Sequence, residues 1–228
     1  MFFDPVYILL ILPALLLAIW AQVKVKGSYG KFSRVPLRSG LSGAQVAQQI
    51  LQSFNLFEVR IEQVPGNLTD HYDPRTKVLR LSPGVYQGRS IASAGIAAHE
   101  VGHAIQHGQG YFPLHLRSAI YPMTALGSNL AMPLFIIGFI FSALPLGRGM
   151  MMLGVLLFTF SVFFTLVTLP VEFNASSRAL HALEGFGYLA PDEMRGARKV
   201  LSAAALTYVA AAAMAILQLV YMFLRARR

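Results

Sequence analysis

The sequence contains no cysteine among its 228 residues. Disulfides are therefore excluded, and any metal site must use histidine or oxygen ligands rather than thiolates. Charged residues are scarce as well, at 13% of the chain, against about 25% in an average soluble domain. Acidic residues are the rarer kind, with 10 Asp and Glu against 19 Lys and Arg. An ordinary charged surface cannot be built from this composition, whereas 55% of the residues are hydrophobic.

Charge is completely absent from four long stretches, residues 5–23, 118–147, 149–171 and 200–224. Each is close to or above the roughly 20 residues that a helix needs to cross a bilayer core. The second stretch is too long for one straight span, so we expect that span to start after Pro122. The first stretch follows Asp4 and precedes Lys24 without a small-residue cleavage site, which favours a membrane anchor over a cleaved signal peptide. The sequence predicts four transmembrane helices.

Basic residues flank these stretches, and this distribution explains the formal charge of +9 without nucleic acid. More of them follow the first stretch (24–38) or precede the fourth (178–199) than lie on the other side, at Arg148 and in the tail at 225–228. The positive-inside rule then places 24–117 in the cytoplasm and both termini outside, although the basic tail argues against this orientation.

The predicted organisation has five parts. Residues 1–23 form an anchor, 24–117 an α+β catalytic region, 118–171 a transmembrane helical hairpin, 172–199 a polar insert, and 200–228 a final transmembrane helix with a basic tail. Within 24–117, alternation and capping residues predict helices at 42–54 and 91–107, a half-buried strand at 57–64, a turn at 73–75 and a strand at 77–82. The expected fold is a mainly α membrane protein with a small α+β extramembrane unit.

The helix at 91–107 carries an HExxH pattern at 99–103. Residues four apart share a helical face, so His99 and His103 can bind one tetrahedral Zn²⁺ at about 2.0–2.1 Å. Glu100 is rotated off that face and can act as general base towards a metal-bound water, whose pKa falls towards ~7. His107 lies one further turn along, about 6 Å beyond His103, and we expect it at the helix C-terminus rather than on the metal. The longer metzincin pattern is absent, because Gln106 stands where that pattern has glycine.

A third protein ligand is expected, because catalytic zinc usually has three. Among the carboxylates on the same predicted side, Glu172 lies at the end of a charge-free stretch, where an unpartnered carboxylate is costly. The small residues that follow it would let this helix approach the helix at 91–107. Glu184 is the second candidate, and the alternative for Glu172 is a snorkelling contact with Arg178. The carboxylates compared are Glu58, Glu62, Asp70, Asp73, Glu172, Glu184, Asp192 and Glu193.

Several segments together resemble the YugP-type membrane zinc metallopeptidases: 81–90, 97–106, the segment 172–176 and the four spans. The resemblance covers nearly the whole chain and implies a zincin-like, gluzincin-type peptidase of the bacterial plasma membrane. That family is distantly similar to the HtpX-type peptidases, whose zinc takes two histidines and one downstream Glu. In those enzymes an Asp stands four residues after the Glu, whereas this chain has Ser176 at that position. Ser176 and Asn174 remain candidates to orient a ligand or to stabilise a transition state.

The favoured function is therefore a zinc endopeptidase at the cytoplasmic membrane face, with a peptide or membrane-protein substrate. An intramembrane site-2-type protease is the first alternative, but no Asp lies between Asp73 and Asp192 to complete its metal site. A scaffold with a structural zinc is the second, and it has no need of Glu100.

His181 could donate to an oxyanion, although a surface contact is the simpler expectation. An exposed edge strand at 77–82 would bind the substrate backbone through Lys77, Val78, Leu79, Arg80 and Leu81. The sequence gives no indication of the oligomeric state.

Overall fold

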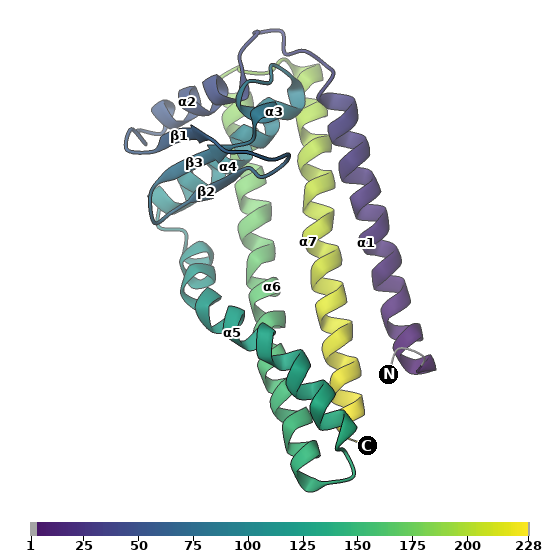
Figure 1. The fold of residues 1–228 in the computed structure, drawn as a ribbon. Helices are drawn as coiled ribbons and strands as arrows, with labels where there is room; N and C mark the ends of the chain where they lie inside the picture. The colour runs from purple at the N-terminus through teal and green to yellow at the C-terminus, as the bar shows by residue number, and fades with distance from the viewer. Residues whose placement is uncertain (1–3, 228) are drawn as a thin grey trace. The chain divides into compact units, whose positions relative to one another are not determined.

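The computed structural model describes residues 4–227, and helices dominate it. Four helices are long and apolar enough to cross a membrane: α1 (Pro5–Phe32), α5 (Phe112–Ile140), α6 (Pro145–Gly185) and α7 (Pro191–Ala226) (Figure 1). The charge-free stretches lie in these helices, and the second one also includes the connection at 141–144 between α5 and α6. The fold is the expected mainly α membrane protein, with a small sheet in its extramembrane part.

The long helices continue well past the charge-free stretches. Helix α6 extends to Gly185 and α7 begins at Pro191, so the polar insert at 172–199 consists mostly of two helix ends. Gly187 lies in the short connection between them with φ +68°, a left-handed conformation that glycine adopts without strain. Helix α5 begins at Phe112 and continues through Pro122. The absence of charged residues therefore marks the apolar part of each helix, but it does not mark where the helix ends.

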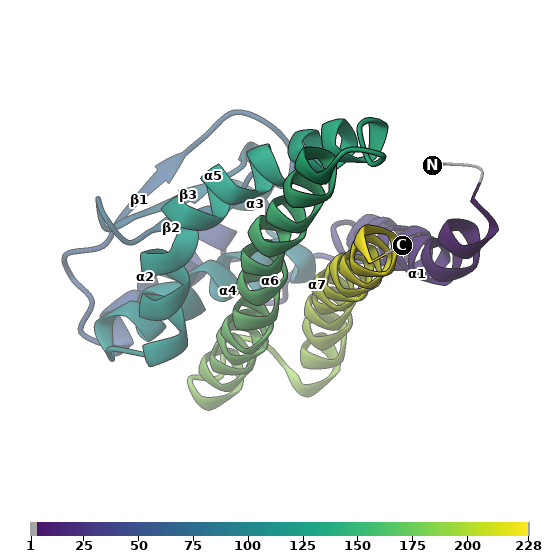
Figure 2. The same cartoon turned by 90° about the horizontal axis from the view of Figure 1, so that it is seen from below.

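The chain divides into two compact units. Unit 1 comprises the described residues up to Ala21, together with His115–Leu169 and the residues from Thr207 onward. Helices α5 and α6 form an antiparallel hairpin there, which Figure 2 shows from below. Glycines allow the close packing, because a Cβ at Gly154 would lie 2.7 Å from the carbonyl oxygen of Ala131.

Unit 2 comprises Gln22–Leu114 and Pro170–Leu206. Its central element is α4 (Ile91–Gly108), which packs against α2 (Gly43–Ser53), α3 (Pro83–Tyr86) and the strands β2 (His71–Asp73) and β3 (Val78–Leu81). Ser42 caps α2 and Ser90 caps α4, each through a reciprocal capping box, as the sequence predicted for both helix starts. The turn predicted at 73–75 lies at 74–77, because Asp73 is the last residue of β2.

The sheet has the strand order β1-β3-β2, with β1 spanning Arg60–Gln63. Strand β3 pairs in parallel with β1 and antiparallel with β2. The prediction of an exposed edge strand at 77–82 is therefore wrong, because β3 is hydrogen-bonded on both sides and Val78, Leu79 and Leu81 are buried. Lys77 lies in the preceding turn with φ 51°, and Arg80 is partly covered. The three-residue strand β2 was not predicted, and it occupies the edge that was assigned to β3.

Candidate metal centre

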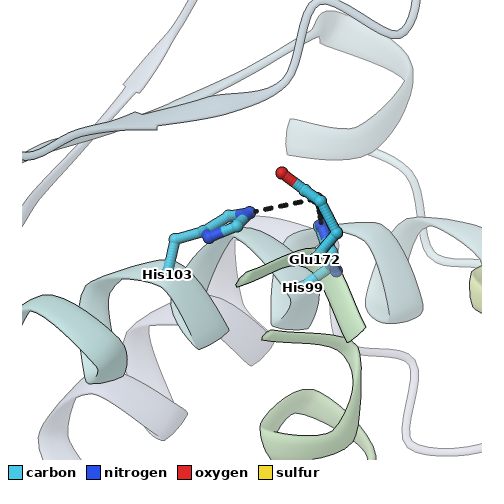
Figure 3. A group of neighbouring side chains, drawn as sticks. All are labelled: His99, His103 and Glu172. Carbon is cyan, nitrogen blue, oxygen red and sulfur yellow. Dashed lines mark hydrogen bonds and ion pairs between the residues drawn. The ribbon is translucent and has the colours of Figure 1, made fainter. Parts of the chain in front are cut away.

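Two histidines on α4 and one glutamate on α6 bring their side chains to one point. The Nε2 atoms of His99 and His103 lie 3.3 Å and 3.6 Å from Oε2 of Glu172. Figure 3 shows both imidazoles on one side of α4 and the carboxylate reaching them from α6. Glu172 is only 3% exposed. The structure thus brings together the three residues that the sequence proposed as metal ligands.

A close contact between the two helices sets this geometry. A Cβ at Gly102 would overlap the carbonyl oxygen of Ala175 on α6. Because Gly102 lacks a side chain, the backbone of α6 can approach the histidine face of α4 closely. Glu172 lies one turn before Ala175 on α6, and its carboxylate therefore reaches both imidazoles.

The other nitrogen of each histidine has a partner of its own. Nδ1 of His99 lies 3.1 Å from the hydroxyl oxygen of Ser176. Nδ1 of His103 lies 3.1 Å from the amide oxygen of Gln106. When Nδ1 donates to these oxygens, Nε2 carries the lone pair and points towards Glu172. Such contacts fix the tautomer and orientation of metal-binding histidines.

Gln106 belongs to a buried network that connects α4 to α6. Its Nε2 donates to the carbonyl oxygen of Val171 at 2.8 Å and to Oδ1 of Asn174 at 2.9 Å. Arg178 donates to the same Asn174 oxygen at 2.6 Å and also to Gln109. The alternative prediction, in which Arg178 pairs with Glu172, is not what the structure shows. Asn174 takes part in the contact between α4 and α6 through its Oδ1 atom, which accepts both hydrogen bonds.

Glu100 is buried beside this group, at 8% exposure. Burial raises the pKa of Glu100 to about 7, and the nearby Glu172 carboxylate also raises it, whereas His99 and the backbone amide of Tyr72 in β2 lower it. A carboxyl group with a pKa near neutrality can accept and return a proton at physiological pH. Glu100 follows His99 by one residue and is therefore rotated off the histidine face of α4, and its role as a general base stays a prediction.

Comparison with known proteins identifies the family. The family model described as "Putative neutral zinc metallopeptidase" matches residues 7–227. The chain belongs to this family. It is 48% identical to the "Putative membrane protease YugP" of Bacillus subtilis (strain 168) over 224 aligned residues. The alignment covers 97% of this chain and 98% of that relative. No solved structure matches the chain.

The donor set fits the zinc that the family name implies. Two imidazole nitrogens and one carboxylate oxygen, all within 4.8 Å of one another, form the His₂Glu set that is found in catalytic zinc sites. The Nδ1 partners orient both imidazoles for binding through Nε2.

Other residues that the sequence singled out lie away from these ligands. His181 and Glu184 are exposed on α6, about 13 Å and 18 Å further along the helix than Glu172. The structure therefore does not bring His181 to the reacting centre or support Glu184 as the third ligand. His107 is in the last turn of α4, and its Nδ1 lies 2.9 Å from the Tyr72 hydroxyl. Gln106 was not predicted to contact His103 and α6, although it lies three residues after His103 on the same helical face.

Proposed function

We propose that this chain is a membrane-bound zinc-dependent endopeptidase that hydrolyses peptide bonds at the cytoplasmic membrane face. The observation that carries the proposal is the convergence of His99, His103 and Glu172, with both Nδ1 atoms engaged elsewhere. These three residues would hold the metal. Bound zinc would supply Lewis-acid activation of a water molecule and of the substrate carbonyl.

Glu100 would handle the protons of the reaction. In hydrolysis a water oxygen forms a bond to the scissile carbonyl carbon, the C–N bond breaks, and the leaving amine takes up a proton. Glu100 takes the proton from the attacking water and returns it to the amine nitrogen. A pKa of about 7 suits both steps, because the carboxylate form and the acid form are both accessible near neutrality.

We further propose that the substrate backbone binds along β2. Strand β2 is an edge of the sheet and contacts α4, and the backbone amide of Tyr72 interacts with Glu100. An extended peptide added to this edge would pass beside the base, and main-chain hydrogen bonds would hold the scissile bond straight. Strand β1 is the opposite edge of the sheet.

Hydrogen–deuterium exchange can test this assignment. A peptide inhibitor with a zinc-binding group should slow amide exchange at 71–73 and leave exchange at 60–63 unchanged. Protection of β1 instead, or of neither strand, would contradict substrate binding along β2.

Three variants test the activity itself. Glu100→Gln should retain zinc but lose about 10²- to 10⁴-fold in kcat, the usual contribution of a general base. Glu172→Ala should lower zinc occupancy and peptide cleavage together. Glu184→Ala removes a carboxylate from the same helix and should leave both near normal. Zinc content is measured on purified protein in detergent, and cleavage with an unbiased peptide library. Wild-type turnover by Glu100→Gln would refute the mechanism.

A further inference from the structure

A basic cavity lies between α1 and α7 within unit 2, away from the metal ligands. Its volume is about 590 Å³, within the 300–1,000 Å³ typical of small-molecule sites. Four cationic side chains line it, one from α1 and three from α7: Lys24, Arg195, Arg198 and Lys199. The two helices pack closely at this level, because a Cβ at Gly196 would lie 2.9 Å from the ring of Phe32.

The cavity lies at the boundary between charged and charge-free sequence on both helices. Lys24 directly follows the charge-free stretch of α1, and Lys199 directly precedes that of α7. These stretches are the parts of the helices that suit a hydrocarbon core. The cationic end of the cavity is therefore expected at the level of lipid headgroups.

The lining of the cavity changes from charged to apolar along α7. Arg195, Arg198 and Lys199 are followed by Ser202 and then by Ala203 and Leu206, which share one face of the helix. On α1, Ser28 lies on the cationic side, one turn beyond Lys24. A ligand that matches this order carries a phosphate at one end and an acyl chain at the other. A soluble phosphate compound would not use the apolar end.

Carboxylates near the cavity are already engaged. Arg38 pairs with Asp192 at 2.7 Å, and its backbone N–H donates to Glu193 at 2.8 Å. Glu193 also accepts a hydrogen bond from the backbone N–H of Ala190. Within residues 4–227, no carboxylate forms an ion pair with Arg195, Arg198 or Lys199 of the cavity. Because the cations Arg195, Arg198 and Lys199 lie close together and repel one another, the site favours an anionic ligand.

We propose that this cavity binds the headgroup of an anionic phospholipid, with the phosphate between the α1 and α7 cations and an acyl chain against Ala203 and Leu206. Basic pockets between membrane helices are a known form of lipid recognition. The bound lipid would connect α1 to α7. Because Ala197 of α7 also packs against Gly95 of α4, the connection lies next to the helix that carries HExxH.

Binding can be measured with phosphatidylglycerol and phosphatidylcholine of matched chains, added to the purified full-length protein in detergent and counted by native mass spectrometry. We expect one tightly bound phosphatidylglycerol. Its dissociation constant should be at least about tenfold higher in Arg198→Gln/Lys199→Gln, which removes two phosphate-binding charges. Lys26→Gln/Arg34→Gln removes the same charges from the same side of the membrane but outside the cavity, and it should stay within about twofold of wild type.

A second variant keeps the test decisive if the double substitution unfolds the protein. Ser202→Trp fills the cavity without changing its charge, and it should also abolish the tight site. Equal binding of phosphatidylcholine, or equal weakening by the control pair, would overturn the proposal. Displacement of the lipid by glycerol phosphate or inorganic phosphate at comparable concentration would also overturn it, because the apolar end would then contribute nothing.

Discussion

Single polar side chains on α4 and α6 decide how the metal ligands point. His99 and His103 each use Nδ1 for a contact inside the protein, one with a hydroxyl and one with an amide. A neutral hydroxyl can accept the Nδ1–H hydrogen bond but cannot stabilise an imidazolium as a carboxylate does. We infer that Ser176 fixes the orientation of the His99 imidazole through this neutral contact.

Replacing Ser176 by Ala should therefore weaken zinc binding by about 10- to 100-fold, the usual cost of losing such a contact. The imidazole would no longer be fixed in the orientation that presents Nε2. Competition with a chelator, read out as zinc retained by the purified protein, measures the change. Ser177→Ala is the matched control, because Ser177 is the neighbouring serine and is exposed. Equal zinc affinity in both variants would contradict a positioning role for Ser176.

Glu100 should make the stability of the metal-free protein depend on pH. Its pKa is about 7 in the folded protein against an ordinary 4.5, so the folded state keeps a proton that the unfolded state releases. The resulting loss of stability is absent below pH 4.5, grows as the pH rises to 7, and is complete above pH 7. From the difference between the two pKa values, the loss in the free energy of unfolding is on the order of 3 kcal/mol or less.

The measurement compares wild type with Glu100→Gln, both treated with chelator, from pH 5 to pH 8. The Gln variant cannot ionise, so its advantage in unfolding temperature over wild type should increase across this range. A constant difference between the two proteins would show that burial does not perturb this carboxyl group.

At the scale of elements, the packing of α4 against α6 depends on one position without a side chain. The overlap expected between a Cβ at Gly102 and the Ala175 carbonyl would force the helices apart. Gly102→Ala should therefore destabilise the fold by about 1–3 kcal/mol, as overpacking does, and should lower zinc occupancy because Glu172 moves away.

Gly95→Ala is a control on the same helix. Its added Cβ would meet the Cβ of Ala197 at 3.6 Å, an ordinary contact, and alanine favours a helix over glycine by up to about 1 kcal/mol. The unfolding temperature and the zinc content are measured for both variants and compared with wild type. Zinc loss in Gly95→Ala but not in Gly102→Ala would mean that another contact sets the distance between α4 and α6.

The elements that the sequence predicted are those with a strong local signal. The α2 and α4 starts follow from their serine caps, and the long helices follow from absent charge. Whether β3 is central or at an edge depends on its pairing with β2. Strand β2 has only three residues, which is too short for an alternating pattern to be recognised in the sequence. Gln106 was missed for a related reason, since an amide shows its role only once its partners on α6 are known. The meeting of His99, His103 and Glu172 agrees with the expectation, whereas their binding of zinc remains a prediction.

On the scale of the whole molecule, the ligands, the base and their positioning residues all belong to unit 2. The segments that supply them precede α5 or follow Leu169, so they lie on one side of the membrane when the four long helices span it. The excess of basic residues in these segments favours the cytoplasmic side.

Cysteine labelling can test this orientation, because the chain has no native cysteine. Ser39→Cys lies in an exposed part of unit 2 and should react with an impermeant maleimide only after the cells are permeabilised. Leu144→Cys, in the α5–α6 connection, is the control and should react in intact cells. The opposite pattern would place the metal centre outside the cytoplasm.

The separation of the ligands along the chain has a consequence for biosynthesis. His99 and Glu172 are 73 residues apart, and a ribosome needs roughly 4 to 15 s to add that many. During this interval the HExxH helix is already made, but the carboxylate, Ser176 and Asn174 are not. A nascent chain therefore cannot assemble the complete His₂Glu set before α6 has been synthesised. Under the proposed function, translation order alone would therefore keep the nascent chain inactive until α6 has been made.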